Sequence, residues 1–360
     1  MAWTFEVDKQ DLAATGFVDR EENPALAPSL ASGQALLEIE LFSVTANNIT
    51  YGRTGDKLGY WAFFPAGEGR GVIPAWGFAK VVESATPELV VGERFYGFLP
   101  MATHLVVEPK RLGSGFVDAA SHRAPYAAVY NNYSAAPEPT PFDDQRALLQ
   151  PLMVTSWLVD HYLEREKQFG AEQIILSSAS SKTALSLAWF LRQRGKTQVI
   201  GLTSEGNKES VAGLGCYDQL LTYDEIAKLP NDRASVYIDF AGSGALTGQV
   251  HSHLAEQLVK SIAIGATHPD GGAIGATIAG IKPEFFFAPT HAKMIIEEVG
   301  GRAFEAQFTE ALTRFIAGNP WIKIRTFEGQ DGMEEAYRAA LNSSLLPTEG
   351  TIVRPSAGEA

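Results

Sequence analysis

The sequence contains one cysteine, Cys216, and this scarcity excludes a disulfide framework and a structural zinc site built from cysteines. It has no run of about 18 uninterrupted apolar residues, and its first residues lack the basic and apolar regions of a signal peptide. Positive charge is scarce, because 29 Lys and Arg residues stand against 42 Asp and Glu residues, for a net charge of −13. These absences predict a cytoplasmic protein whose main partner is neither a nucleic acid nor a membrane.

Residues 172–203 are the stretch whose pattern most clearly predicts a structure. The apolar run 174–176 ends at small residues, and from Thr183 apolar residues recur at helical spacing until Gly195. A second apolar run, 199–202, follows. We therefore expect a strand, a tight turn, a helix and a second, parallel strand. A unit of this kind holds a dinucleotide pyrophosphate at the start of its helix.

The turn in this unit lacks the three glycines of a dinucleotide-binding fingerprint. Ser178, Ser181 and Ala184 stand at those positions. Each is small enough for close backbone approach, but any of them that requires a positive φ would be strained. Lys182 lies within the turn and would suit a phosphate, although a solvated lysine in a first helical turn is an equally good interpretation. By itself, the turn leaves a structural unit without a ligand equally open.

The residues before this unit predict a mostly β domain. Residues 35–45 alternate as a half-buried strand, and three short strand-like pieces between 77 and 108 favour a small antiparallel barrel. A polar loop is expected from 47 to 56, where either binding groups or turn chemistry alone would explain its composition. The long, poorly periodic segment 113–147 favours a lid or substrate wall over a plain linker.

The residues after Thr203 continue the alternation of strands and helices, which predicts a doubly wound parallel sheet. His268 follows one of these strands and suggests a site, although a lone loop histidine is more often structural. The phenylalanines 285–287 fit a pocket wall, a dimer contact or the core. We expect strands at 219–223, 236–240, 261–266, 322–327 and 351–354, and helices at 143–167, 247–258, 293–299, 304–316 and 332–343.

Several segments together resemble the medium-chain dehydrogenase/reductase superfamily, closest to its zinc-free quinone oxidoreductase and enoyl reductase branch. The resemblance covers nearly the whole chain, and it also extends to a sub-branch known only as a domain of unknown function, so it does not name the substrate. The segments that carry it are the strand and asparagine loop 41–47, the Gly-Glu-Arg turn 92–97, the threonine-bearing helix 152–155, the second strand 198–208 with the Leu-Gly pair 214–215, and the ending 332–340 with 350–353.

The resemblance implies an α/β fold with a Rossmann-type doubly wound parallel sheet domain and a GroES-like mostly-β barrel domain. Residues 1–140 and 323–360 would form the discontinuous GroES-like substrate domain, and residues 141–322 the dinucleotide-binding domain. The zinc-ligand segment and the four-cysteine lobe of the alcohol dehydrogenases are absent from the sequence, which leaves a catalytic zinc without ligands. A homodimer is also implied.

The end of the second strand bears on the choice between NAD and NADP. NAD-binding proteins place an acidic side chain there, which would repel a 2′-phosphate. Here the strand ends in Thr203 and Ser204, with Lys208 four residues further on, and hydroxyls with a cation suit NADP. Glu205 would reverse this preference if its side chain pointed inward.

The resulting expectation is an NADPH-dependent reductase that transfers hydride, without a metal, to a conjugated carbonyl compound such as a quinone, enone or enoyl compound, in the cleft between barrel and sheet. Tyr51 is the first candidate to donate a hydrogen bond to the carbonyl oxygen, and Asn47 the next. Matching positions assign to the cofactor Thr155, Ser178, Ser180, Ser181, Lys182, Thr183, Thr203, Ser204, Lys208, Ala241, Gly242, Thr267 and His268. Tyr130, Tyr133 and Phe286 would line the substrate pocket, although ordinary packing is the favoured explanation for any one of them.

Two alternatives remain open from the sequence. The serine-substituted turn also fits a protein that keeps the reductase fold and binds NADPH as a regulatory ligand, or binds no nucleotide, without turnover. The other alternative is a metal-free ketone or aldehyde reductase. The fold alone does not decide among these functions.

Overall fold

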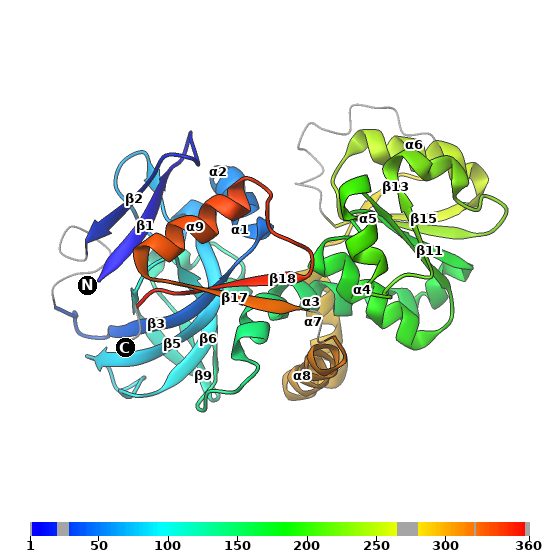
Figure 1. Cartoon of the computed structure of the whole chain (residues 1–360). Helices are drawn as coiled ribbons and strands as arrows, with labels where there is room; N and C mark the ends of the chain where they lie inside the picture. Colours follow the sequence, from blue (N-terminus) through cyan, green and yellow to red (C-terminus); the bar gives the residue numbers. More distant parts are fainter. Residues whose placement is uncertain (1, 20–28, 265–279, 320–321, 357–360) are drawn as a thin grey trace. The chain divides into compact units, whose positions relative to one another are not determined.

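The computed structural model describes residues 2–19, 29–264, 280–319 and 322–356. The chain divides into two compact units, which we name by their secondary structure (Figure 1). The β unit comprises residues 1–148 and 322–360, and the α/β unit comprises residues 149–321.

The α/β unit contains a six-stranded parallel sheet in the order β13-β12-β11-β14-β15-β16. The strand order runs outward in both directions from the neighbours β11 and β14, so the ligand crevice of such a sheet is expected at their carboxyl ends. This confirms the predicted doubly wound sheet. The strands are β11 (Gln173–Leu176), β12 (Gln198–Thr203), β13 (Gln219–Thr222), β14 (Ser235–Asp239), β15 (Leu258–Ala263) and β16 (Glu284–Phe285).

Most helices of the α/β unit lie close to the predicted ranges, although the helix predicted from residue 293 begins at Ala288 and the helix Glu205–Ala212 was not predicted. Helix α4 (Lys182–Arg194) begins after Ser181, whose hydroxyl accepts a hydrogen bond from the backbone N–H of Ala184 at 3.2 Å. It ends at Gly195, which has a left-handed φ of 61°, as expected for a helix stop. The other helices are α3 (Asp143–Arg165, which begins in the β unit), α5 (Glu205–Ala212), α6 (Gly244–Leu254), α7 (Ala288–Val299) and α8 (Gly301–Gly318).

The β unit contains a nine-stranded sheet in the order β17-β18-β3-β5-β6-β10-β9-β8, with β7 paired to β3, and a three-stranded sheet in the order β2-β1-β4. The last helix, α9 (Gly329–Leu341), lies between β17 and β18 in sequence, so the end of the chain returns to this unit, as expected. The strands are β1 (Trp3–Asp8), β2 (Thr15–Asp19), β3 (Ala35–Val44), β4 (Arg70–Gly71), β5 (Pro74–Ser84), β6 (Arg94–Pro100), β7 (His104–Val107), β8 (Pro109–Leu112), β9 (Gly115–Asp118), β10 (Asn132–Ala135), β17 (Lys323–Glu328) and β18 (Glu349–Arg354).

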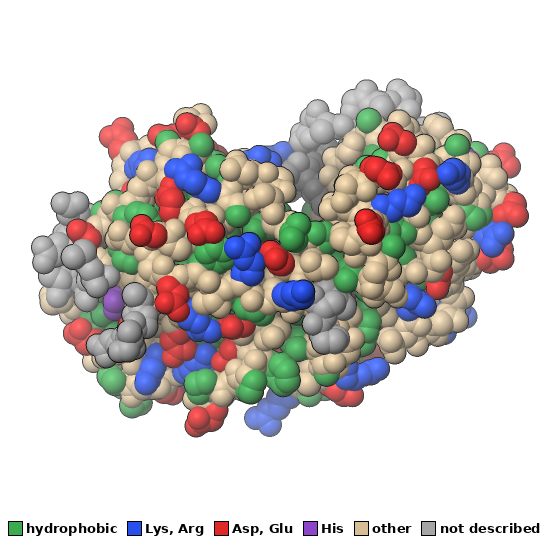
Figure 2. All heavy atoms as spheres, in the orientation of Figure 1, with side chains coloured by type: hydrophobic (Ala, Val, Ile, Leu, Met, Phe, Trp, Pro, Cys, Tyr) green, Lys and Arg blue, Asp and Glu red, His purple; other side chains and the backbone are tan. Residues whose placement is uncertain are grey.

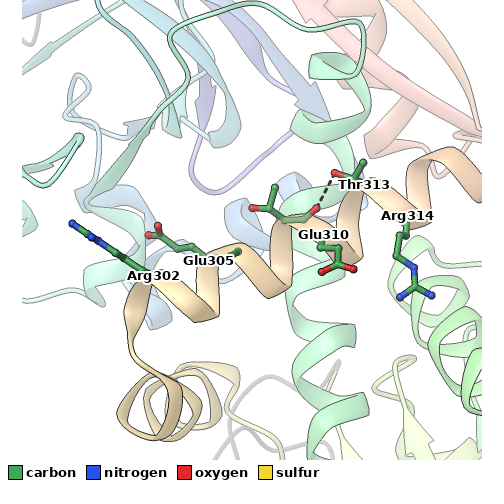
Figure 3. A pocket seen from close by; sticks show the side chains of 7 residues that line it. Arg302, Glu305, Glu310, Thr313 and Arg314 are labelled. Atoms are coloured by element: carbon green, nitrogen blue, oxygen red, sulfur yellow. Dashed lines mark hydrogen bonds between the residues drawn. The ribbon is translucent and has the colours of Figure 1, made fainter.

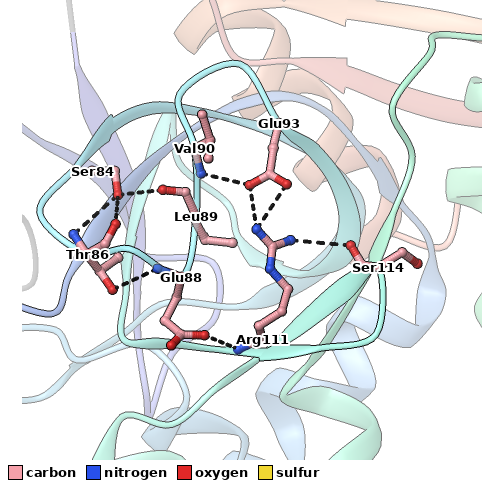
Figure 4. Close-up of polar contacts among 8 residues, drawn as sticks. All are labelled: Ser84, Thr86, Glu88, Leu89, Val90, Glu93, Arg111 and Ser114. Atoms are coloured by element: carbon pink, nitrogen blue, oxygen red, sulfur yellow. Dashed lines mark hydrogen bonds and ion pairs between the residues drawn. The ribbon is translucent and has the colours of Figure 1, made fainter.

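The Gly-Glu-Arg turn that carried part of the family resemblance has a structural role. Gly92 has a φ of 96°, a conformation that favours glycine. The next residue, Glu93, forms a 2.8 Å ion pair with Arg111 and accepts from the backbone N–H of Val90, which fixes the loop between β5 and β6 (Figure 4). Arg94 is 5 % exposed and pairs with Glu40 and Asp143 at 2.6 and 2.8 Å, so this motif stabilises the β unit.

The predicted polar loop 47–56 is wrong, because these residues form the helices α1 (Ala46–Arg53) and α2 (Gly55–Leu58). Helix α1 begins with a reciprocal capping box: the Thr45 hydroxyl accepts from the Asn47 backbone N–H, and the Asn48 side chain accepts from the Thr45 backbone N–H. Ile49 lies on the buried face of this helix. The polar composition therefore reflects helix capping and an exposed helical face.

The segment 113–147 is more regular than its lack of periodicity indicated. It contains β9 and β10, which pair with each other and with β8 and β6, and two short 3-10 helices, Ser121–Arg123 and Ala128–Tyr130. Arg123, which is 1 % exposed, fixes the segment by a 2.5 Å ion pair with Asp118. Strands of four residues are too short to show a period in the sequence.

No helix in the described ranges is long and apolar enough to cross a membrane. On the face shown in Figure 2, the acidic and basic side chains that are described lie interspersed.

Candidate functional site

The turn between β11 and α4 is held by contacts on several sides. Ser178 has a φ of 49°, the left-handed conformation that a fingerprint glycine would adopt without strain. Ala179 donates its backbone N–H to the Leu202 carbonyl of β12 at 2.9 Å, and its carbonyl accepts from the Tyr217 hydroxyl at 2.9 Å. The turn is therefore fixed although none of its residues is glycine.

Close approach between the turn and β12 depends on Gly201. A Cβ atom at this residue would lie 2.8 Å from the Cβ of Ala179 and 2.9 Å from the ring of Tyr217. The glycine that allows close packing is thus on the neighbouring strand rather than in the turn. Sequence analysis missed it because the contact joins residues far apart in the chain.

Asp239, the last residue of β14, organises the loop that follows this strand. Its side chain is 6 % exposed and accepts from the Ser177 hydroxyl at 2.6 Å and from the Thr247 hydroxyl at 3.2 Å. It also accepts from the backbone N–H groups of Ala241 and Gly242, at 2.9 and 3.2 Å. These two residues lie at the carboxyl ends of the central strands as predicted, but Asp239 already binds their amides.

The end of β12 presents the residues that were assigned to the NADP phosphate. Thr203 is fully buried, and its hydroxyl has no hydrogen-bond partner among the described residues. Ser204 precedes α5 and is exposed, and its side chain makes no capping bond. Glu205 is exposed in the first turn of α5.

Two contacts connect the start of α5 to its neighbours. The Asn207 side chain donates to the Ser180 hydroxyl at 3.2 Å, which joins α5 to the turn before α4. Lys208 donates to Glu225 at 2.5 Å, and Glu225 also binds Lys228 at 2.7 Å. Hydrogen bonds from these two lysines and from the Thr222 backbone N–H hold the pKa of Glu225 well below its usual value. Lys208 therefore lies where predicted, with a carboxylate as its partner.

The remaining cofactor assignments lie at the start of α4 or outside the described residues. Lys182 and Thr183 are half-buried in its first turn, and the Thr183 carbonyl accepts from the Ser156 hydroxyl of α3 at 2.7 Å. Thr155, the neighbour of Ser156, is half-buried on α3. The residues at 267 and 268 lie outside the described ranges.

In the β unit, Tyr51 and Tyr130 meet in a cluster of aromatic side chains. The rings of Tyr51 and Tyr60 lie 4.5 Å apart, and the hydroxyls of Tyr60 and Tyr130 are 3.1 Å apart. The ring of Phe98 lies 5.8 Å from that of Tyr51 and 4.7 Å from that of Tyr130. Burial raises the pKa of the Tyr51 hydroxyl far above its usual value and that of Tyr60 to about 12, so both remain protonated donors at neutral pH.

Three other predicted residues lie apart from this cluster or in the core. Asn47 is exposed on α1. The predicted pocket residue Tyr133 is a core residue, because it is 2 % exposed and its hydroxyl donates to the Phe98 carbonyl at 2.6 Å and accepts from Arg123. Phe286 is 4 % exposed in the α/β unit and stacks on His291 with ring centroids 4.1 Å apart.

A depression of about 600 Å³ lies along α8, lined by side chains between Arg302 and Arg314 (Figure 3). All of its lining residues belong to this one helix, so it is an open surface and we infer no ligand site there. Among the described residues, no group of three or more His, Cys, Asp or Glu side chains is placed to hold a metal ion.

The residues at the carboxyl ends of β11, β12 and β14 fit a dinucleotide. Gly201 gives the turn the close approach that a phosphate-binding turn requires. The Thr203 hydroxyl is a buried polar atom without a partner in the part of the chain that the structure describes, and Ser204 and Lys208 follow it in sequence. Hydroxyl and ammonium groups of this kind suit a ribose and its phosphate.

Comparison with solved structures shows that the chain has a known fold. CurA from Vibrio vulnificus in complex with NADPH has a TM-score of 0.66 at 12% identity, over 99% of this chain and 100% of that chain. The quinone oxidoreductase from Coxiella burnetii has a TM-score of 0.55 at 14% identity, over 98% and 99%. A mutant form of the enoyl thioester reductase from Candida tropicalis has a TM-score of 0.53 at 11% identity, over 98% and 99%.

The chain therefore shares the fold of these structures, with a Rossmann-type α/β unit and a GroES-like mostly-β unit, which confirms the predicted fold class and, at the level of the fold, the predicted resemblance. The chain belongs to the family described as protein of unknown function (DUF2855), whose model matches residues 42–345. A search among curated proteins found no match.

Proposed function

We propose that this protein is an NADPH-dependent reductase that transfers a hydride, without a metal, to a conjugated carbonyl compound such as a quinone, an enone or an enoyl compound. The observation that carries the proposal is the tightly held turn between β11 and α4, with the Thr203 hydroxyl at the end of the next strand, which has no partner among the residues described. The fold shared with CurA, whose structure holds NADPH, supports a dinucleotide in this place.

The α/β unit would hold the cofactor by its turn and by the start of α5. The first turn of α4 offers backbone N–H groups and the positive end of the helix dipole to the pyrophosphate. Ser204 and Lys208 would bind the 2′-phosphate, for which Lys208 must share its charge with Glu225. When bound, NADPH would supply a hydride from C4 of its nicotinamide.

The β unit would stabilise the charge that develops on the acceptor. Addition of a hydride to the β-carbon of an enone brings two electrons, which leave negative charge on the carbonyl oxygen as an enolate. A proton taken up at the α-carbon completes the reduction. The Tyr51 hydroxyl is protonated at neutral pH, and burial raises its pKa further, so it would donate a hydrogen bond to the developing oxyanion.

The test of this proposal is the oxidation of NADPH in the presence of a panel of quinones, enones and enoyl thioesters. Tyr51→Phe should lower kcat by at least about tenfold, because loss of one donor to an oxyanion commonly costs that much or more. Its affinity for NADPH should be unchanged. Retention of full activity by Tyr51→Phe would remove this residue from the mechanism, and the absence of NADPH oxidation with every acceptor would contradict the reductase proposal.

One observation favours the second candidate, a protein that binds NADPH without turnover. Asp239 binds the amides of Ala241 and Gly242, and Glu225 binds Lys208, so several groups assigned to the cofactor already have partners within the chain. Tight binding of NADPH with no oxidation by any acceptor would favour this candidate. Product analysis would separate alkene reduction from reduction of a ketone or aldehyde, which is the third candidate.

A further inference from the structure

Two hydrogen-bond donors buried in the β unit lack an acceptor. The indole Nε1 of Trp76 and the hydroxyl of Tyr96 have no hydrogen-bond partner among the described residues. Tyr96 is only 2 % exposed. Since a buried donor without a partner loses its hydration with no compensation, each such group in a folded protein requires an explanation.

These two donors lie side by side on one face of the sheet. Strands β5 and β6 are antiparallel, with Trp76 opposite Phe98 and Tyr96 opposite Phe78. Trp76 and Tyr96 are therefore diagonal neighbours, and their rings stack with centroids 5.8 Å apart and planes inclined by 18°. The sheet itself thus holds both donors in fixed positions.

The same face of the sheet is covered by the aromatic cluster that contains Tyr51. The ring of Phe98 lies 5.0 Å from that of Trp76 and 5.8 Å from that of Tyr51. The Trp76 indole N–H faces the Tyr51 hydroxyl and partly offsets the rise in its pKa that burial causes, but it completes no hydrogen bond to any residue described. Tyr51 in turn adds to the rise in the pKa of Tyr96, so the three side chains lie close together. Tyr51 and Trp76 are half-buried, so neither side chain is fully enclosed by the protein.

The charge near these donors favours an oxygen that carries negative charge. The guanidinium of Arg146 lies 5.1 Å from the centre of the Tyr96 ring, and its positive charge opposes the rise in the pKa of Tyr96 that burial causes. An indole N–H can only donate, and the hydroxyl of Tyr96 still needs an acceptor. A carbonyl or enolate oxygen meets this requirement, whereas an ammonium group does not.

We propose that Trp76 and Tyr96, together with Tyr51, donate hydrogen bonds to the carbonyl oxygen of the acceptor. This inference rests on the proposed function, and it specifies the part of the acceptor that the β unit binds. The rings of Phe98 and Tyr130 beside these donors suit a planar conjugated acceptor, which stacks on aromatic side chains.

The first arm of the test measures stability and needs no enzymatic activity. Tyr96→Phe removes a buried hydroxyl that has no partner within the described ranges, so the urea midpoint of this variant should rise above that of the wild type. Tyr337→Phe is the matched control, because Tyr337 is equally buried in the β unit and its hydroxyl donates to the Leu12 carbonyl at 2.9 Å. The urea midpoint of Tyr337→Phe should fall below that of the wild type. A fall for Tyr96→Phe as well would show that its hydroxyl is paired within the protein and would overturn the inference.

The second arm measures kcat/KM for cyclohex-2-enone at saturating NADPH. Tyr96→Phe and Trp76→Phe should each lower kcat/KM by at least about tenfold and leave the affinity for NADPH unchanged. Tyr337→Phe should keep the kcat/KM of the wild type. Wild-type kcat/KM in Tyr96→Phe would overturn the inference and leave the reductase proposal intact.

If the wild type reduces no acceptor, the reductase proposal fails, and the site is then tested by the rise in melting temperature that cyclohex-2-enone causes. A rise in the wild type that is lost in Tyr96→Phe would support the site, and equal shifts would overturn it.

Discussion

Ser178 is the residue at which this chain departs most clearly from a glycine fingerprint. Its φ of 49° is left-handed, whereas Ser181, at another fingerprint position, has a φ of −72°. Of the three residues at fingerprint positions, Ser178 alone therefore has the positive φ at which a residue other than glycine is expected to be strained. A strained residue at a turn of this kind is a common feature of ligand-binding sites.

We expect Ser178→Gly to increase the free energy of unfolding by roughly 1 kcal/mol, because glycine adopts a left-handed conformation without steric cost. Urea unfolding of the purified variant measures this change. Ser180→Gly is the control, since it removes the acceptor of the Asn207 hydrogen bond and should lower stability. A loss of stability in Ser178→Gly would show that its side chain contributes more than its backbone strain costs.

At the scale of elements, helix α1 carries both a structural cap and the candidate residue Asn47. Thr45→Ala removes the capping hydroxyl and should lower the free energy of unfolding by about 1 kcal/mol. Asn47→Ala changes an exposed side chain and should alter the free energy of unfolding by less than about 0.5 kcal/mol. Thermal unfolding distinguishes the two variants. Equal destabilisation would mean that Asn47 also holds the helix, and a loss of activity in Asn47→Ala could then not be assigned to catalysis.

The start of α5 allows a prediction about cofactor selectivity. Glu225 neutralises part of the charge of Lys208, so Glu225→Gln should tighten NADPH roughly twofold to fivefold and leave NADH unchanged. Equilibrium titration at low salt measures both dissociation constants. Glu209→Gln makes the same change of charge on an exposed residue of α5 that forms none of the ion pairs of this cluster. Equal tightening by both variants, or none, would contradict a specific role for Glu225.

Periodicity predicted most strands and helices of the α/β unit within a few residues, and it did so best where an element such as α4 has a buried apolar face and a clear stop at Gly195. It predicted neither α5 nor the exposed strand β16. It failed at α1, where a capping box sets the structure, and at β9 and β10, which are too short to show a pattern. The partners of the candidate site could not be predicted either. Gly201, Asp239 and Glu225 act on residues distant in sequence, and only the fold brings them together.

At the scale of the whole molecule, the β unit concentrates tyrosines whose hydroxyls resist ionisation. Burial raises the pKa of Tyr51 and Tyr96 far above the usual value and that of Tyr60 to about 12. Because the folded state keeps these protons while an unfolded chain releases them near pH ~10, their contribution to stability is complete below pH ~10. This contribution to stability is lost as the pH rises above ~10 and through the higher pKa values of the folded state.

We therefore expect the free energy of unfolding to fall steeply above pH ~10, and Tyr60→Phe to make this fall less steep. Urea unfolding at pH 8, 10 and 11 measures the slope. A stability that does not change across this range would show that the tyrosines ionise equally in the folded and unfolded states.

The central claim, that the α/β unit binds NADPH, is tested most directly by titrating the purified protein with NADPH and, separately, with NADH, while nicotinamide fluorescence and melting temperature are followed. We predict selective binding of NADPH that is weakened in Lys208→Ala. Binding of neither nucleotide would contradict the claim, because the serine-substituted turn would then have lost the dinucleotide and the carboxyl ends of β11 and β12 would serve another ligand.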